Sequence, residues 1–104
     1  MHTINTIEQL KSVVEQNKTV VVDLYADWCA PCQQMLPVVE ELSKEVDVPF
    51  YKVNIDTLPE AKEFTGAKAI PMLLVYSQGK KREFAFGITP KDKVKNKIER
   101  VMKN

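Results

Sequence analysis

The stretch that decides the fold is Tyr25-Ala26-Asp27-Trp28-Cys29-Ala30-Pro31-Cys32. Before it, residues 20–25 are β-branched and almost continuously apolar, which is typical of a central strand covered on both faces. After it, apolar residues recur at helical spacing, so the two cysteines lie where a strand is followed by a helix. A thiol at a helix start faces free backbone N–H groups and the positive end of the helix dipole, and both favour the thiolate. The second thiol lies one turn away on the same face, so the pair is predicted to switch between dithiol and disulfide.

The composition predicts one domain. A chain of 104 residues with 44% hydrophobic content fits a single globular domain over residues 1–104. No apolar run is long enough to span a bilayer, and the N-terminus lacks the basic start and the long apolar segment of a signal peptide. We therefore expect a cytoplasmic protein that does not bind membranes, and a monomer is the default expectation.

The cysteine count favours redox chemistry over a structural role. Two cysteines in a reducing compartment are more often a redox pair than a permanent disulfide. A structural zinc site needs about four ligands, whereas this chain offers the two cysteines and a remote His2. No metal is therefore expected.

The C-terminal residues are strongly basic. Residues 91–104 carry six Lys or Arg against two acidic residues. Such a stripe is usually the solvated face of a helix, and no aromatic-rich basic surface accompanies it, so nucleic acid is not an expected partner. A nucleic-acid binder remains an alternative, with affinity that falls steeply as salt rises. Its contacts would come from Lys93, Lys97, Arg100 and Lys103.

The first two thirds of the chain alternate between strand and helix patterns. After a short edge strand, the capping-box spacing of Thr6-Ile7-Glu8-Gln9 starts a helix that continues to about Gln16. The helix from the cysteine motif carries Pro37 in its interior, where proline should kink it. Residues 50–55 read as a second central strand, and a short helix ends near Gly66.

The last third predicts a hairpin and a helix. Residues 72–76 and 82–86 are strand-like and flank Ser77-Gln78-Gly79-Lys80, where the glycine supplies the turn. Thr89 is expected to cap a final helix that has Pro90 at its first position. The expected fold class is therefore α/β, with a central mixed β-sheet of four to five strands flanked by about four helices.

Five landmarks occur in a characteristic order and spacing. They are Asp23 in the apolar strand, Trp28-Cys29-Ala30-Pro31-Cys32, Pro37, Lys52-Val53-Asn54-Ile55-Asp56, and Ile70-Pro71 ahead of the hairpin. With Gly79 and Gly87, this set resembles the thioredoxin family over nearly the whole chain. The resemblance implies the thioredoxin fold and a protein-disulfide reductase that needs no bound cofactor. It also implies a thioredoxin reductase as the partner that regenerates the dithiol.

Three positions depart from the commonest pattern of that family. Ala30 stands where glycine is usual, Gln33 where lysine is frequent, and Ala69-Ile70-Pro71-Met72 lacks the usual glycine and threonine around the proline. Residues between the cysteines help to set the reduction potential. The departures therefore affect the expected potential and the choice of partner, while the expected reaction type is unchanged.

The resemblance also implies roles for catalytic residues. Cys29 is the expected nucleophile and Cys32 the resolving thiol, and two idle buried thiols are the alternative. In thioredoxins the residue equivalent to Asp23 assists proton transfer with the resolving thiol, and Lys52 would balance its charge. A structural ion pair is the alternative for both of these residues.

A substrate-binding surface is implied beside the cysteines. Pro71 corresponds to the family's cis-proline, and Ile70 would lend its backbone to an extended substrate segment. Without the resemblance, Pro71 reads as a trans proline at a strand start. Trp28 and Tyr25 are expected as a lid and a wall, with ordinary core packing as the alternative. The other expected contacts of disulfide-containing protein substrates are Ala30, Pro31, Ala69 and Gly87.

Two other functions fit the same pattern. An oxidant or isomerase would need export and a strongly stabilised Cys29 thiolate, and the sequence shows no export signal. A non-enzymatic interaction module would keep its function when Cys29 is replaced by serine. The dependence of function on Cys29 therefore separates the reductase from the module.

Overall fold

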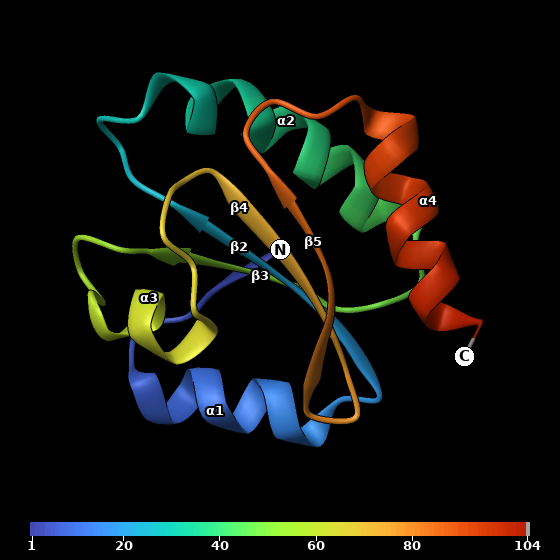
Figure 1. Cartoon of the computed structure of the whole chain (residues 1–104), viewed down its shortest axis with the longest axis horizontal. Helices are drawn as coiled ribbons and strands as arrows, with labels where there is room; N and C mark the ends of the chain where they lie inside the picture. The colour runs from blue at the N-terminus through green and yellow to red at the C-terminus, as the bar shows by residue number, and fades with distance from the viewer. Residues whose placement is uncertain (104) are drawn as a thin grey trace.

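The computed structural model describes residues 1–103, in which a five-stranded mixed sheet lies between two layers of helices (Figure 1). The elements in chain order are β1 (His2–Thr3), α1 (Ile7–Gln16), β2 (Thr19–Tyr25), α2 (Ala30–Glu45), β3 (Phe50–Asn54), α3 (Glu60–Thr65), β4 (Met72–Ser77), β5 (Lys80–Phe86) and α4 (Lys91–Met102). The strand order is β1-β3-β2-β4-β5. Strands β1, β3 and β2 are parallel, while β4 is antiparallel to both β2 and β5. The expected α/β architecture is confirmed.

Strand β2 is central because both of its edges are paired. Residues 21–25 pair in parallel with β3, and residues 19–24 pair antiparallel with β4. Every residue of β2 before Tyr25 is buried. Burial on both faces explains why this stretch of the sequence is apolar at nearly every position.

The two faces of the sheet carry separate apolar layers (Figure 1). Helices α1 and α3 cover one face, where Val20, Val22 and Leu24 of β2 belong to the same core cluster as residues of α1. Helices α2 and α4 cover the other face, where Val21 is clustered with the buried stripes of both helices. Those stripes contain Met35, Val39 and Leu42 of α2 and Val94, Ile98 and Val101 of α4. Within residues 1–103, no helix combines the length and the apolar character that crossing a membrane requires.

The start of α1 and the end of α3 lie where the sequence predicts them. The Oγ1 of Thr6 accepts a hydrogen bond from the N–H of Gln9 at 3.1 Å. The Gln9 side chain accepts in return from the N–H of Asn5 at 2.9 Å, one residue earlier than in a standard capping box. Helix α3 ends at Gly66, whose φ of 76° lies in the left-handed region that favours glycine.

The hairpin between β4 and β5 is tighter than predicted. Ser77 and Lys80 pair with each other as strand residues, so the turn consists of Gln78 and Gly79. Their φ angles are 53° and 79°. Positive φ at both turn residues is typical of a type I′ turn, which matches the twist of the two strands.

The expected cap of α4 is wrong. Thr89 precedes the helix, but its hydroxyl donates backwards to the carbonyls of Phe86 and Gly87 at 3.5 and 3.4 Å. Pro90 occupies the N-cap position, and no side chain caps the helix there. The N–H of Thr89 donates to the Sδ of Met35 at 3.4 Å, which connects this segment to α2. A threonine next to free carbonyl groups has a local alternative to capping, and here that alternative prevails.

One carboxyl group lies inside the core. Asp23, in β2, is only 3% exposed and lies opposite Lys52 of β3 in register. Burial raises the pKa of Asp23 from 3.8 to about 7, and the positive charge of Lys52 limits that rise. The charged carboxylate therefore opposes folding.

We expect Asp23→Asn to stabilise the oxidised protein at high pH. Burial raises the pKa of Asp23 from 3.8 to about 7 in the folded state. In the pH window between these two values, Asp23 holds a proton in the folded chain and has lost it in the unfolded chain. Wild-type stability should therefore fall as pH rises through the window and stay low above it. At about pH 8 the variant should gain roughly 4 kcal/mol over the wild type, and at about pH 4 it should gain little.

Urea unfolding of both proteins across this pH range measures the effect. The exposed Asp47→Asn is the matched control, because it removes the same charge outside the core. A stability difference between wild type and Asp23→Asn that is the same at both pH values would contradict the buried charge.

Candidate active site

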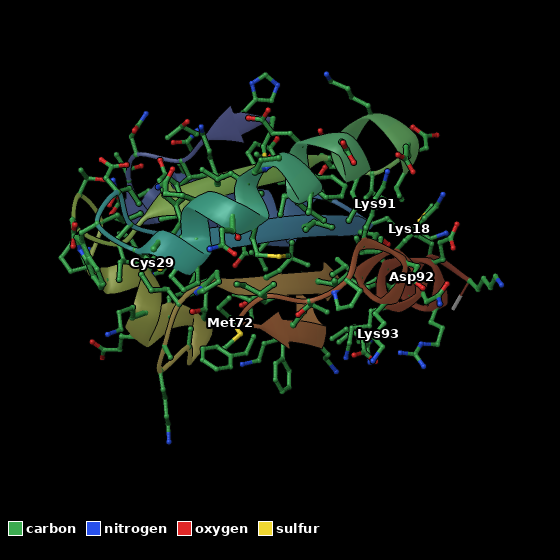
Figure 2. All side chains as sticks on the ribbon, turned by 90° about the horizontal axis from the view of Figure 1, so that it is seen from above. Lys18, Cys29, Met72, Lys91, Asp92 and Lys93 are labelled. Carbon is green, nitrogen blue, oxygen red and sulfur yellow. A yellow bond between two sulfur atoms is a disulfide. The ribbon has the colours of Figure 1, made fainter. Side chains whose placement is uncertain are left out.

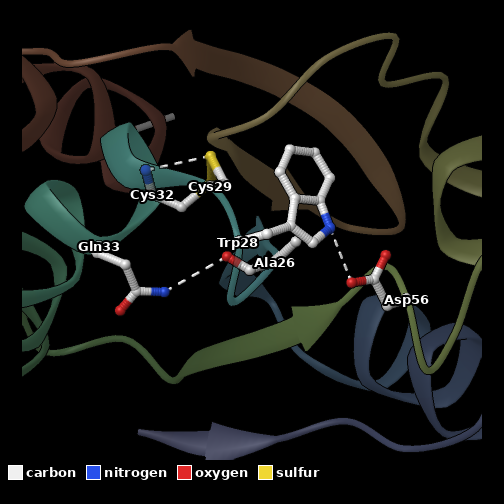
Figure 3. Close-up of a disulfide and its surroundings, with 6 residues drawn as sticks. All are labelled: Ala26, Trp28, Cys29, Cys32, Gln33 and Asp56. Atoms are coloured by element: carbon white, nitrogen blue, oxygen red, sulfur yellow. Dashed lines mark hydrogen bonds between the residues drawn. A yellow bond between two sulfur atoms is a disulfide. The ribbon is translucent and has the colours of Figure 1, made fainter.

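The Cys29–Cys32 disulfide lies at the amino end of α2, and Figure 2 shows Cys29 at one end of the molecule. Cys29 is the N-cap residue and Cys32 lies in the first turn, with their Cα atoms 5.2 Å apart. The Cys29 Sγ accepts a hydrogen bond from the N–H of Cys32 at 3.3 Å (Figure 3). Pro31 fits the same turn because its missing N–H has no partner to lose there. After reduction, this position stabilises a Cys29 thiolate through the free N–H groups and the helix dipole.

The turn before α2 is fixed by hydrogen bonds around Ala26. Its carbonyl accepts from the N–H of Cys29 at 3.2 Å. It also accepts from the Nε2 of Gln33 at 3.4 Å (Figure 3). The N–H of Gln33 donates to the carbonyl of Cys29 at 3.1 Å. Gln33, at the position where the family often has lysine, thus ties its side chain back to the turn that presents Cys29.

Trp28 stands outside the core beside the cysteines. It is 69% exposed, and its Nε1 donates to the Oδ2 of Asp56 at 2.9 Å (Figure 3). This exposure rules out the alternative of core packing for Trp28, and its role as a lid stays a prediction. Tyr25 is half-buried, with the Nζ of Lys52 5.8 Å from the centre of its ring. Sequence reasoning assigned no role to Asp56, because nothing local predicts its bond to Trp28.

An open groove of about 540 Å³ borders Cys29. Five of the residues predicted to contact substrate line this groove. They are Trp28, Ala30, Pro31, Ala69 and Ile70. Ile55, Lys62 and Lys68 also line it, and sequence reasoning missed all three as site residues. Their side-chain directions depend on how α3 and its loops pack, and no motif in the sequence reports that.

Pro71 lies directly after the groove residues Ala69 and Ile70. The Ile70–Pro71 peptide bond is cis, as the resemblance implies. The carbonyl of the buried Pro71 accepts from the N–H of Gly87 at 2.9 Å. The structure therefore places Gly87 against Pro71, and it is not among the residues that line the groove.

Asp23 lies on the face of the sheet that α2 covers. Side chains alternate along a strand, so Asp23 shares a face with Val21, which packs in the α2 and α4 layer. The buried stripe of α2 begins with Cys32 and continues through Met35. Burial raises the pKa of Asp23 to about 7, with Lys52 acting in the opposite direction. A carboxyl group that holds or releases a proton near neutral pH thus lies on the face of the sheet that α2 covers, while Cys32 itself belongs to the core cluster that includes residues of α1.

Asp23 and Lys52 are register partners on adjacent strands. Within residues 1–103, no hydrogen bond or ion pair joins the two side chains. Their interaction is an electrostatic one at longer range, and it acts through the pKa of Asp23. In the described part of the chain, no group of three or more His, Cys, Asp or Glu side chains is arranged to hold a metal ion.

Comparison with known proteins covers nearly the whole chain. Residues 2–100 match the protein family described as Thioredoxin. The chain is 30% identical to the thioredoxin of Rickettsia typhi over 93 residues, which span 88% of this chain and 89% of that protein. It is 35% identical to Thioredoxin-1 of Saccharomyces cerevisiae over 86 residues, with 82% and 84% covered. The X-ray structure of Fasciola hepatica thioredoxin matches with a TM-score of 0.88 at 33% identity, covering 96% of this chain and 98% of that one.

These similarities extend from the sheet to the helix that carries the cysteine pair. The fold, the spacing of the two cysteines and their bond in the structure agree with one another. The chain belongs to the thioredoxin family, and its activity is protein-disulfide reduction by thiol–disulfide exchange.

Proposed function

We propose that Cys29 attacks the disulfides of protein substrates and that Cys32 then releases the reduced product. The position of Cys29 carries this assignment, because it caps α2 and also borders the open groove. Cys32 is 1% exposed and does not line the groove. A substrate sulfur that enters the groove therefore meets Cys29 first.

The reaction consists of two exchanges. The Cys29 thiolate attacks one sulfur of the substrate disulfide, the substrate S–S bond breaks, and the other substrate sulfur leaves as a thiolate. Cys32, as a thiolate, then attacks the Cys29 Sγ of this mixed disulfide. The second substrate thiolate leaves, and the Cys29–Cys32 disulfide forms. Two electrons pass from the protein dithiol to the substrate, which ends as two thiols when its thiolates take up protons.

We assign to Asp23 the proton that Cys32 loses before the second exchange. This assignment rests on the face that Asp23 shares with the α2 stripe and on its pKa of about 7. A group with this pKa can accept a proton near neutral pH and release it again. Lys52 favours the charged carboxylate and so keeps its pKa from rising further.

The groove can bind an extended segment of the substrate. Its walls near Cys29 are apolar at Ala30, Pro31 and Ala69. Ile70 lies just before β4, and among residues 1–103 its backbone makes no hydrogen bond. Its N–H and C=O are therefore free to pair with a substrate backbone, as in β-strand addition.

We further propose that a thioredoxin reductase regenerates the dithiol and that the protein works in the cytoplasm. A reductase of protein disulfides ends each cycle oxidised, so it needs a partner that returns two electrons. A reducing compartment supplies such partners and keeps thiols reduced. The absence of cysteines other than the pair is consistent with this setting.

Reduction of insulin disulfides, with dithiothreitol as the recharging reductant, tests the assignment of the two thiols. Cys29→Ser should fall to the background rate, because a serine hydroxyl does not exchange with disulfides. Prereduced Cys32→Ser, mixed with insulin after dithiothreitol is removed, should attack once and then remain as a mixed disulfide with insulin, which mass spectrometry detects. Full turnover by Cys29→Ser would contradict the proposed mechanism. It would favour the alternative of an interaction module whose function does not depend on its thiols.

The second exchange can be followed alone. When Cys29 is preloaded with a coloured aromatic thiol, attack by Cys32 releases the colour. In the wild type this rate should rise as pH passes about 7, where Asp23 loses its proton. Asp23→Asn should be about tenfold slower or worse at neutral pH and should lack the rise.

The control for this experiment is Asp47→Asn, which removes an exposed acidic group and should behave as the wild type. If Asp23→Asn and the wild type have the same pH profile, Asp23 does not take the proton from Cys32.

A further inference from the structure

Lys62 and Lys68 bring positive charge to a groove that is otherwise uncharged. Lys62 lies on α3 and Lys68 in the loop between α3 and β4, and both are exposed. Both line the groove that contains Cys29. Within the described part of the chain, the other residues of that lining are uncharged.

The packing of α3 explains why Lys62 faces the groove. Glu60 and Glu63 lie three residues apart and so share a face of the helix. They line a separate depression together with Lys11 of α1. The acidic face of this short helix is therefore turned toward α1, and Lys62 lies on the side of the groove.

Neither ammonium group is neutralised by a partner. Among residues 1–103, the side chains of Lys62 and Lys68 form no ion pair and no hydrogen bond. By contrast, Lys91 and Lys95 on α4 both pair with Glu45. The charge at the groove is thus available to a ligand.

We propose that Lys62 and Lys68 select protein disulfides that carry Asp or Glu beside the attacked cysteine. This inference rests on the function proposed above, since it concerns substrates that enter the same groove. Lys68 lies two residues before Ile70, so its side chain flanks the segment that would pair with the Ile70 backbone. A carboxylate beside the substrate cysteine then meets two positive charges on an apolar surface.

The size of the preference follows from the exposure of the lysines. Exposed ion pairs are weak and screened by salt, so each lysine should contribute about threefold in kcat/KM. Together they should favour an acidic peptide over a basic one by about tenfold at low salt. This preference should shrink as salt is added, because solvent screens both charges.

Three peptide disulfides of equal length test the proposal, with Asp, Ser or Lys on either side of the attacked cysteine. The measurement is kcat/KM for reduction by the wild type and by Lys62→Gln/Lys68→Gln, with the Asp-to-Lys ratio as the readout. That ratio should fall toward one in the double variant. In Lys62→Glu/Lys68→Glu the preference should reverse in favour of the Lys peptide.

The matched control is Lys18→Gln/Lys93→Gln, which removes the same net charge. Figure 2 shows both of these lysines at the end of the molecule away from Cys29. The control should keep the wild-type ratio. An equal loss of preference in the control would show that the overall charge steers the peptides, and it would overturn the assignment to the groove.

The remaining outcomes separate this inference from the function on which it rests. If the wild type reduces the three peptides at equal rates, or if the double variant keeps the wild-type ratio, the selectivity is overturned and the reductase stands. If the wild type reduces none of the peptides and does not reduce insulin, the proposed function fails and this inference fails with it.

Discussion

The active site depends on one constraint, which is the burial of β2 on both faces and its pairing along both edges. A strand held in this way has no freedom to shift, and it ends at Tyr25, just before the cysteine motif. Helix α2 then packs back on the sheet through Met35, Val39 and Leu42. Because strand and helix are both anchored by the core, the helix end that carries Cys29 has a defined position at the edge of the groove.

The same strand accommodates the least favourable side chain of the core. A carboxyl group at Asp23 costs stability when it is charged, and an apolar residue at this position would not. Its burial also brings its pKa to about 7, which an exposed aspartate does not reach. The burial that gives Asp23 a pKa suited to proton transfer therefore also lowers the stability of the fold. Lys52 reduces both effects, because its positive charge favours the charged carboxylate.

The backbone and the reactive pair could be predicted from the sequence, whereas much of the groove could not. Three features depend only on residues close together in the sequence, so a local pattern predicts them. They are the apolar run of β2, the cap at Thr6 and the spacing of the cysteines. The cis bond before Pro71 came from the family resemblance alone. The contributions of Ile55, Lys62 and Lys68 depend on tertiary packing, which no local pattern reports. The Thr89 hydroxyl could either cap α4 or donate to a preceding carbonyl group. The preference of threonine for helix caps predicted the first, and the structure shows the second.

The hydrogen bonds that hold the segment after β5 have a consequence for electron transfer. The N–H of Gly87 donates to the carbonyl of Pro71, and the N–H of Thr89 donates to the Sδ of Met35, so this segment is joined to the residue before β4 and to α2 three residues after Cys32. None of these bonds involves the sulfur atoms that change oxidation state. Opening the disulfide therefore removes one covalent link from a frame that other contacts maintain. The same scaffold is thus available to carry the two cysteines through both sulfur exchanges, because none of its hydrogen bonds has to break when the disulfide opens.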